Sequence, residues 1–186
     1  MANAYRVSDQ SSAYFLTFQI VGWVDLFTRK DYRDIVIENL KYCQKNKGLY
    51  LYAFVIMSNH IHMLAQNVNG DMSGFIRDFK SYTVKQFIDF IENGNESRKD
   101  WLKVVFAYHG KLKSKQEYQI WTHENHAELI YSQHFIEQKV NYIHNNPVKN
   151  GLVEKPEDYL YSSARNYAGL ESLIDVIKVD FLWKTI

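Results

Sequence analysis

Two apolar stretches separated by a short polar turn constrain the fold of this chain more than any other feature. Residues 49–57 and 60–67 have the length and composition of strands, and Ser58-Asn59 between them favours a tight turn. Because successive side chains of a strand point to opposite faces of a sheet, His60 and His62 should share a face, with Ile61 directed into the core. Two imidazoles on one face can hold a divalent metal ion, although two hydrogen-bonded surface histidines produce the same pattern.

Regular elements are expected on both sides of this hairpin. Residues 14–21 are aromatic and β-branched, which is typical of a strand. Residues 31–47 form an amphipathic helix that Gly48 is placed to end. Residues 72–93 predict a second helix, because large apolar side chains recur there at multiples of four.

The second half of the chain predicts a short strand at residues 118–121 and a third helix at residues 132–146. That helix should stop before Pro147, because a residue preceding proline is driven away from the α region. Residues 101–108 fit a helix or a strand equally well. The order is that of a ferredoxin-like α+β sandwich, an antiparallel sheet with helices on one face, plus an added C-terminal helix.

The composition is that of a globular protein, with 46% hydrophobic residues among 186. We expect a single domain over residues 1–186, with a core at about 14–167 and a tail at 168–186. Cys43 is the only cysteine, which excludes an internal disulfide and a cysteine-rich zinc site. No apolar run reaches the roughly 18 residues needed to cross a bilayer, and the N-terminus lacks the pattern of a signal peptide. These features predict a cytoplasmic protein without a membrane partner.

Basic residues are concentrated in one segment although the formal net charge is only +1. Residues 98–115 contain six lysines and arginines against one acidic residue, and Lys111, Lys113 and Lys115 are the best candidates for phosphate contacts. A solvated lysine-rich loop would have the same composition.

The third helix carries a tyrosine that its apolar stripe does not explain. Tyr142 lies about 200° around the helix from Val140, a member of that stripe, at 100° per residue. Asn146, four residues later, lies on the same face as Tyr142. Tyr142 is therefore available for chemistry, or packs as an amphipathic side chain at the edge of the helix.

The histidine pair and the region around Tyr142 together resemble a known family. His60-Ile61-His62, followed by the block from Tyr142 through Asn145-Asn146-Pro147 to Val153, is similar to the single-tyrosine transposases among the HUH nucleases. The similarity is greatest to the REP-associated tyrosine transposases, and it extends from about Tyr14 to Tyr167. The run from Glu157 to Ala164 also resembles the tail of that group.

The resemblance implies cleavage and rejoining of single-stranded DNA that carries hairpin or palindromic repeats. Tyr142 would be the nucleophile, forming a 5′-phosphotyrosine and leaving a free 3′-hydroxyl. His60 and His62 would bind Mg²⁺ or Mn²⁺, which polarises the scissile phosphate. Insertion-sequence relatives place a glutamine one turn after the tyrosine as a third ligand, and here Asn146 stands there. Its shorter amide is a candidate ligand, or it caps the helix before Pro147.

Further DNA contacts are expected from Lys111, Lys113 and Lys115 and from His123 and His126, although the two histidines could equally be surface residues. His144 lies about 200° from Tyr142, which indicates a structural role. The resemblance allows a monomer or a homodimer, and we expect a monomer.

Two other functions remain open from the sequence alone. A transposase-derived regulator could bind DNA without cutting it. A metal-dependent hydrolase of small phosphoesters could use the same histidines, but Met63-Leu64-Ala65-Gln66 supplies no acidic ligand after them.

Overall fold

A computed structural model describes residues 6–113 and 117–179 of the chain. The strands and helices follow one another in the order β1 (Ala13–Gln19), α1 (Lys30–Asn46), β2 (Leu49–Ile56), β3 (His60–Asn67), α2 (Met72–Asn93), α3 (Lys99–Lys113), β4 (Glu128–Leu129), α4 (Gln133–Lys149) and α5 (Ala164–Tyr167). Three short 3₁₀ turns are η1 (Val21–Trp23), η2 (Leu26–Thr28) and η3 (Pro156–Asp158).

The sheet has the order β2-β3-β1-β4, and every neighbouring pair is antiparallel. Strand β3, which carries the two histidines, is therefore a central strand between β2 and β1. The turn at Ser58-Asn59 is closed by the Met57 amide, which donates to the His60 carbonyl over 2.8 Å. This topology confirms the predicted ferredoxin-like sandwich.

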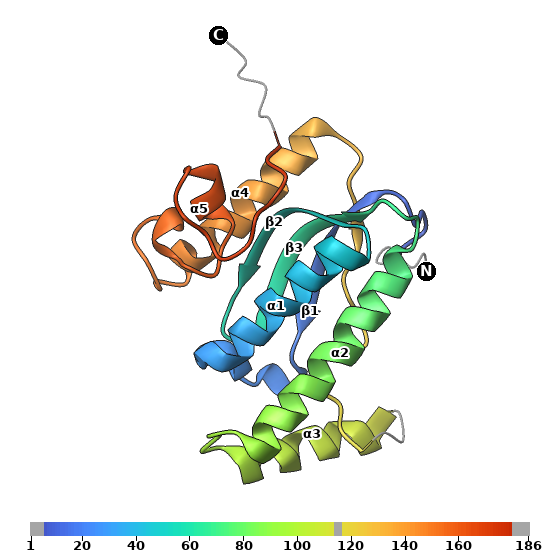
Figure 1. The fold of residues 1–186 in the computed structure, drawn as a ribbon, viewed down its shortest axis with the longest axis vertical. Helices are drawn as coiled ribbons and strands as arrows, with labels where there is room; N and C mark the ends of the chain where they lie inside the picture. The colour runs from blue at the N-terminus through green and yellow to red at the C-terminus, as the bar shows by residue number, and fades with distance from the viewer. Residues whose placement is uncertain (1–5, 114–116, 180–186) are drawn as a thin grey trace.

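The two faces of the sheet are covered by different helices (Figure 1). Helices α1 and α2 pack on one face, where Leu16, Phe18 and Ile61 belong to the main apolar core. Helix α4 lies on the other face, where Val140 and Ile143 contact a smaller apolar cluster that includes sheet residues such as Phe15 and Val55. The tyrosine-bearing helix is thus an addition to the ferredoxin-like core, as expected.

Helix α2 matches its predicted bounds and buries its large apolar stripe. Phe75, Phe79, Phe87 and Ile91 are each at most 3% exposed. The Asp71 carboxylate accepts a hydrogen bond from the Gly74 amide and caps the start of the helix. Residues 101–108, which the sequence left open, belong to a helix, α3.

The fourth strand is not where the sequence placed it. Residues 118–121 pair with the sheet through a single bridge between Ile20 and Trp121, whereas β4 pairs with Tyr14 and Phe15. Packing explains this difference, because the Trp121 ring is 4% exposed and lies among Phe18, Phe27 and other core aromatic rings. The segment is therefore held by the packing of Trp121 together with two backbone hydrogen bonds, in which the Val21 amide donates to the Ile120 carbonyl and the Thr122 amide donates to the Gln19 carbonyl, each over 2.8 Å.

The third predicted helix also does not stop before Pro147. Helix α4 continues through Pro147 to Lys149, with Ser132 as its N-cap. The proline lies in the last turn, where its missing N–H removes only one backbone hydrogen bond, and its side chain is buried. The carbonyls of Asn146 and Pro147 are satisfied, because they accept hydrogen bonds from the Asn150 and Leu152 amides. The predicted helix end before Pro147 is therefore wrong, and so is the alternative in which Asn146 caps the helix.

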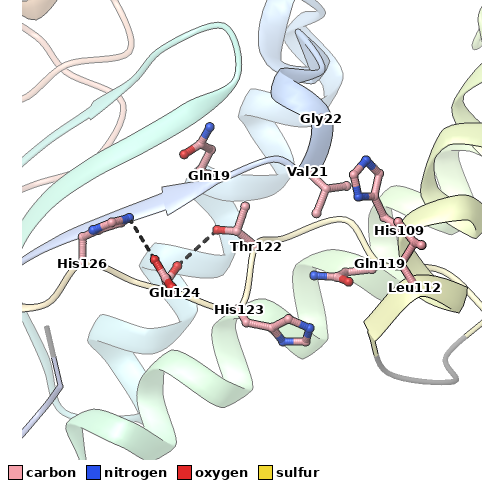
Figure 2. Close-up of a pocket in the computed structure, with 10 residues that line it drawn as sticks. All are labelled: Gln19, Val21, Gly22, His109, Leu112, Gln119, Thr122, His123, Glu124 and His126. Carbon is pink, nitrogen blue, oxygen red and sulfur yellow. Dashed lines mark hydrogen bonds and ion pairs between the residues drawn. The ribbon is translucent and has the colours of Figure 1, made fainter. Parts of the chain in front are cut away.

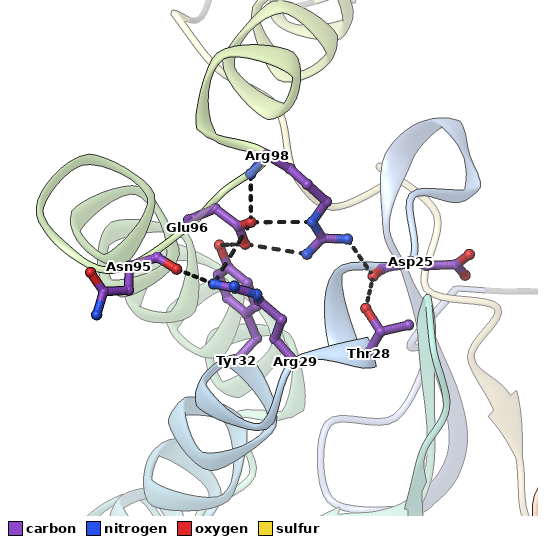
Figure 3. Close-up of polar contacts among 7 residues, drawn as sticks. All are labelled: Asp25, Thr28, Arg29, Tyr32, Asn95, Glu96 and Arg98. Carbon is purple, nitrogen blue, oxygen red and sulfur yellow. Dashed lines mark hydrogen bonds and ion pairs between the residues drawn. The ribbon is translucent and has the colours of Figure 1, made fainter.

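A closed polar cluster joins the α2–α3 connection to α1 (Figure 3). The Glu96 side chain is fully buried and accepts hydrogen bonds from the Tyr32 hydroxyl over 2.8 Å and from the Arg98 side chain over 3.2 Å. Arg29 forms an ion pair with the same carboxylate, and Arg98 also donates to the Asp25 carbonyl. We call Tyr32, Arg29, Glu96 and Arg98 the Glu96 cluster.

The C-terminal part of the described chain runs beside the free edge of β2. The Ile56 amide donates to the Tyr161 carbonyl, and the Ser163 amide donates to the Phe54 carbonyl. Further on, the Ile177 amide donates to the Leu51 carbonyl. Within residues 6–113 and 117–179, no helix has the length and apolar character needed to span a bilayer.

Candidate functional site

His60 and His62 lie side by side on the α4 face of the sheet, as the alternation of β3 predicts. Their ring centroids are 4.7 Å apart. Ile61 between them is fully buried in the core on the opposite face. His62 is 6% exposed, whereas His60, at the beginning of the strand, is only partly buried.

Each imidazole is held by a polar neighbour at Nδ1. In His60 this nitrogen lies 2.7 Å from Asn59 Oδ1, and because an amide oxygen can only accept, Nδ1 carries the proton and Nε2 keeps its lone pair. In His62 the same nitrogen lies 2.9 Å from Thr17 Oγ1. The pairing of β1 with β3 places Thr17 opposite His62. The Thr17 hydroxyl can donate or accept, and in the tautomer with the proton on Nδ1 His62 directs its Nε2 lone pair into the site.

The surroundings of both rings favour the neutral form. Burial lowers the pKa of His60. Burial, together with the nearby charges of His60 and Lys139, lowers the pKa of His62 to about 3. Neutral imidazole is the form that binds a metal ion. The two side chains are thus available as ligands near neutral pH.

Tyr142 approaches His62 from α4. Its hydroxyl oxygen lies 3.4 Å from His62 Nε2, a long hydrogen bond, and the two ring centroids are 5.1 Å apart. Phe15 supports both rings, with centroid distances of 5.3 Å to His62 and 5.9 Å to Tyr142. Tyr142 as a whole residue is 41% exposed. We call His60, His62 and Tyr142 the histidine–tyrosine cluster.

Two lysines of α4 place positive charge beside this cluster. Lys139 Nζ lies 4.2 Å from the Phe15 ring centroid and pairs with the Glu128 carboxylate of β4 over 2.8 Å. Lys149 Nζ lies 5.9 Å from the Tyr142 ring centroid. Neither these lysines nor Thr17 and Asn59 were predicted as site residues from the sequence. Only their helical spacing to Tyr142 could have identified the lysines.

Asn146 lies one turn beyond Tyr142, and its side chain is mostly buried. Its Oδ1 accepts a hydrogen bond from Asn150 Nδ2 over 3.0 Å. An amide oxygen has a second lone pair, so Asn146 retains the capacity to accept or to ligate there.

The donor set fits a metal ion with an open coordination sphere. His60 and His62 offer two oriented nitrogens, each fixed through its other nitrogen in the manner typical of metal-binding histidines. The described residues contain no group of three or more His, Cys, Asp or Glu side chains that could hold a metal. The remaining ligands would therefore be oxygens from an amide, water or a substrate phosphate, which Mg²⁺ and Mn²⁺ accept.

Two of the candidate DNA contacts, His123 and His126, lie in a pocket outside the histidine–tyrosine cluster. His123 and His126 line a pocket of about 320 Å³, together with His109, Gln19 and Gly22 among others (Figure 2). His126 Nε2 lies 3.6 Å from a Glu124 carboxylate oxygen. Gln19 is the partner of His60 in the β1–β3 register, so this pocket borders the histidine–tyrosine cluster.

The lysine candidates belong to α3 and the segment after it. Lys111 is exposed on α3, and Lys113 is the last residue of that helix. Lys115 lies outside the described residues. His144, in contrast, is 8% exposed, its Nε2 lies 2.9 Å from Ser163 Oγ, and burial lowers its pKa to about 4. These are the surroundings of a structural histidine.

The chain is similar to known transposases in sequence and in fold. The family model described as IS200-like transposase matches residues 23–146, a range that includes His60, His62, Tyr142 and Asn146. A solved structure of a REP-associated tyrosine transposase bound to a REP hairpin matches with a TM-score of 0.58 and 21% identity, over 98% of this chain and 96% of that one. No curated protein matches the sequence. Since the family model matches more than half of this chain, the chain belongs to the IS200-like transposases, a family of enzymes that act on DNA.

Proposed function

We propose that this chain cleaves and rejoins single-stranded DNA through a covalent 5′-phosphotyrosine on Tyr142. The observation that carries the proposal is the position of the Tyr142 hydroxyl, 3.4 Å from His62 Nε2 and beside a second oriented histidine. A tyrosine nucleophile next to two imidazoles that can bind a metal ion is suited to metal-assisted phosphoryl transfer.

In this reaction the Tyr142 oxygen attacks the scissile phosphorus, and the bond from phosphorus to the 3′ oxygen breaks. The phenol loses its proton, and the departing 3′ oxygen gains one and becomes a free hydroxyl. The phosphoester is conserved in the link to Tyr142, so the 3′-hydroxyl of another end can reverse the step and rejoin strands without ATP.

His60, His62 and Asn146 are the proposed metal ligands. A bound Mg²⁺ or Mn²⁺ would polarise the scissile phosphate and offset the charge that develops on its oxygens. The histidines are oriented for this role by Asn59 and Thr17. For Asn146 to participate, its Oδ1 must use the lone pair that Asn150 does not occupy.

The proposed substrate is single-stranded DNA with hairpin or palindromic repeats. The transposase with the similar fold was solved with a REP hairpin bound, which supports this choice. Lys111, His123 and His126 are proposed to contact the DNA, and the same role is proposed for Lys113 and Lys115. We propose that the protein acts as a monomer, with a homodimer as the alternative.

A denaturing gel tests this proposal. Labelled single-stranded DNA from the flanks of the protein's own gene is incubated with the protein and Mn²⁺, and EDTA replaces the metal in a parallel sample. We expect a covalent adduct that needs the metal and disappears in Tyr142→Phe. Tyr131→Phe is the matched control, because Tyr131 is 75% exposed just before α4 and should be dispensable.

The result also separates the other functions. A complex in a native gel with no adduct from any flank would contradict the proposal and favour a DNA-binding regulator. Hydrolysis of a small phosphoester that persists in Tyr142→Phe would favour a phosphoesterase, because such an enzyme does not need the tyrosine.

A further inference from the structure

A basic groove runs along α2, away from the histidine–tyrosine cluster. It has a volume of about 630 Å³ and lies between one face of α2 and residues 118–125. Ser73, Arg77, Ser81 and Lys85 line it at intervals of four residues, so they form one stripe on the helix. From Ser73 to Lys85 this stripe is roughly 18 Å long at 1.5 Å per residue. We call it the α2 groove.

The groove is positively charged. Its lining includes Arg77, Lys80 and Lys85, and none of the described residues that line it is acidic. Arg77 pairs with Asp78, but Lys47 pairs with the same carboxylate, so one of these two positive charges remains uncompensated. Such a surface attracts phosphates.

Lys80 lies at the back of the groove and holds its two walls together. Its Nζ donates to the Thr122 carbonyl over 2.7 Å and lies 5.6 Å from the Phe18 ring centroid. Thr122 belongs to the opposite wall of the groove. Arg77 and Lys85 are exposed at the rim, where a bound phosphate backbone can reach them.

The side chains of the groove favour paired DNA over unpaired bases. Binding of a single strand uses exposed aromatic rings on which bases stack. The two aromatic residues that line the groove are Tyr118, which is partly buried, and Trp121, which is 4% exposed. Cations and small hydroxyl groups along a helix instead suit the backbone of a duplex, whose bases are already stacked.

The groove is continuous with the pocket beside the histidine–tyrosine cluster. Gln119, Thr122 and His123 line both cavities. Figure 2 shows these side chains on the segment that leads from α3 towards His126 and Gln19. Because Gln19 pairs with His60 in the sheet, the end of the groove at His123 opens towards the side of the sheet where the histidines lie.

We propose that the α2 groove binds the phosphate backbone of a paired DNA stem, while the adjoining single strand passes His123 to reach Tyr142. This inference rests on the proposed function, and it names the part of the substrate that this surface recognises. Roughly 18 Å of helix corresponds to about five base pairs at 3.4 Å each.

The test is the salt dependence of hairpin binding by Arg77→Gln/Lys85→Gln. Both side chains are exposed and lie outside the proposed catalytic machinery, whereas a Lys80 substitution would disturb the packing of the groove. Fluorescence anisotropy is measured in EDTA, which prevents cleavage, with a labelled hairpin whose stem of about ten base pairs exceeds the length of the groove. A scrambled strand that cannot pair is the second probe.

Loss of two phosphate contacts should make the slope of log K against log salt less negative by about 1.8. Between 50 and 200 mM salt the wild-type protein should therefore lose about 12-fold more hairpin affinity than the variant. The scrambled strand should show no such difference. Lys41→Gln/Lys45→Gln, which removes two exposed positive charges from α1, is the matched control and should keep the wild-type slope.

Each other outcome contradicts the inference. If the slope is unchanged in the variant while the wild-type protein still forms the Tyr142 adduct, the proposed DNA binding by the α2 groove is wrong and the proposed function is unaffected. If the slope changes equally for the hairpin and for the scrambled strand, the groove does not select a paired stem. If the slope changes equally in the α1 control, the effect is one of general charge and not of the groove. Wild-type protein that neither binds the hairpin nor forms an adduct overturns both proposals.

Discussion

The Glu96 cluster and the histidine–tyrosine cluster both hold buried polar side chains against an apolar core, but they differ in what their polar atoms contact. The Glu96 carboxylate is surrounded by Tyr32, Arg29 and Arg98 from the same chain (Figure 3). In the histidine–tyrosine cluster, each imidazole is held at one nitrogen, and the 3.4 Å contact of His62 Nε2 with Tyr142 is long.

The difference shows how a structural cluster can be distinguished from a candidate reactive site. A buried carboxylate that is enclosed by donors stabilises the fold, and removing it leaves those donors unpaired. Neutral imidazoles with one oriented nitrogen remain able to bind a ligand from solution. Changes in the first cluster should therefore affect stability, and changes in the second should affect metal binding and DNA chemistry.

The largest expected effect is on stability, from Glu96→Ala. Loss of the carboxylate leaves Tyr32, Arg29 and Arg98 without their shared acceptor, and we expect unfolding to become easier by about 3 kcal/mol, near the lower end for a buried ion pair because the arginines are partly exposed. Urea denaturation measures this change. Glu92→Gln, in an exposed pair with Lys103, should cost less than about 1 kcal/mol. Equal costs for the two variants would remove the contrast between the clusters.

The second prediction concerns Thr17→Val. The substitution keeps the shape of the side chain but removes the hydroxyl that orients His62 Nδ1. We expect the Kd for Mn²⁺ to rise by about 10- to 100-fold, as is typical for the loss of a residue that orients a metal ligand. Calorimetric titration measures it, and Thr17→Ser should retain most of the affinity. Wild-type affinity in Thr17→Val would show that the hydroxyl does not orient His62 for a metal.

The third prediction uses the acid sensitivity of the Glu96 cluster. Although burial opposes it, hydrogen bonds from Arg98 and Tyr32 hold the pKa of Glu96 below its ordinary value of 4.5. A carboxyl whose pKa is lower in the folded state contributes stability above its unfolded pKa and loses it as pH falls through the folded pKa. The stability difference between wild type and Glu96→Gln should thus be constant above about pH 5 and shrink below pH 4.5.

Denaturation curves recorded across this pH range test the sign of the effect. If the difference instead grew as the pH fell, the carboxylate would not be stabilised by its neighbours in the folded protein.

The smallest effect is expected for Asn59→Ala. His60 loses the acceptor for its Nδ1 proton, but His60 and Asn59 are only partly buried, so a water molecule can replace the amide. We expect the Kd for Mn²⁺ to rise by less than about tenfold, below the effect of Thr17→Val. An effect larger than that of Thr17→Val would reverse the order of importance of the two supporting residues.

The alternation of side chains along β3 was sufficient to predict that His60 and His62 share a face, because backbone geometry directs every second side chain of a strand to the same face. The order of elements was sufficient for the ferredoxin-like topology. Tyr142 was placed off the apolar stripe by helical geometry, but its role came only from the family resemblance. Its contact with His62 depends on how α4 crosses the sheet, which no local pattern encodes.

Other features depend on contacts between distant segments. Thr17 reaches His62 through the register of β1 and β3, and strand β4 has only two residues, too few for a periodic signal. Helix α4 passes through Pro147 because tertiary packing outweighs the local preference of the residue before proline. The Glu96 cluster joins a loop to α1 across more than sixty residues, which a single sequence does not reveal.

Peptide mapping of the DNA adduct tests the central claim most directly. The adduct is treated with nuclease and trypsin, and the residual nucleotide is located by mass spectrometry. Cleavage after Lys139 and Lys149 releases residues 140–149, in which Tyr142 is the only hydroxyl-bearing side chain. We predict that the added phosphate or nucleotide lies on Tyr142 in this peptide. An adduct on any other peptide would contradict the assignment of Tyr142 as the nucleophile.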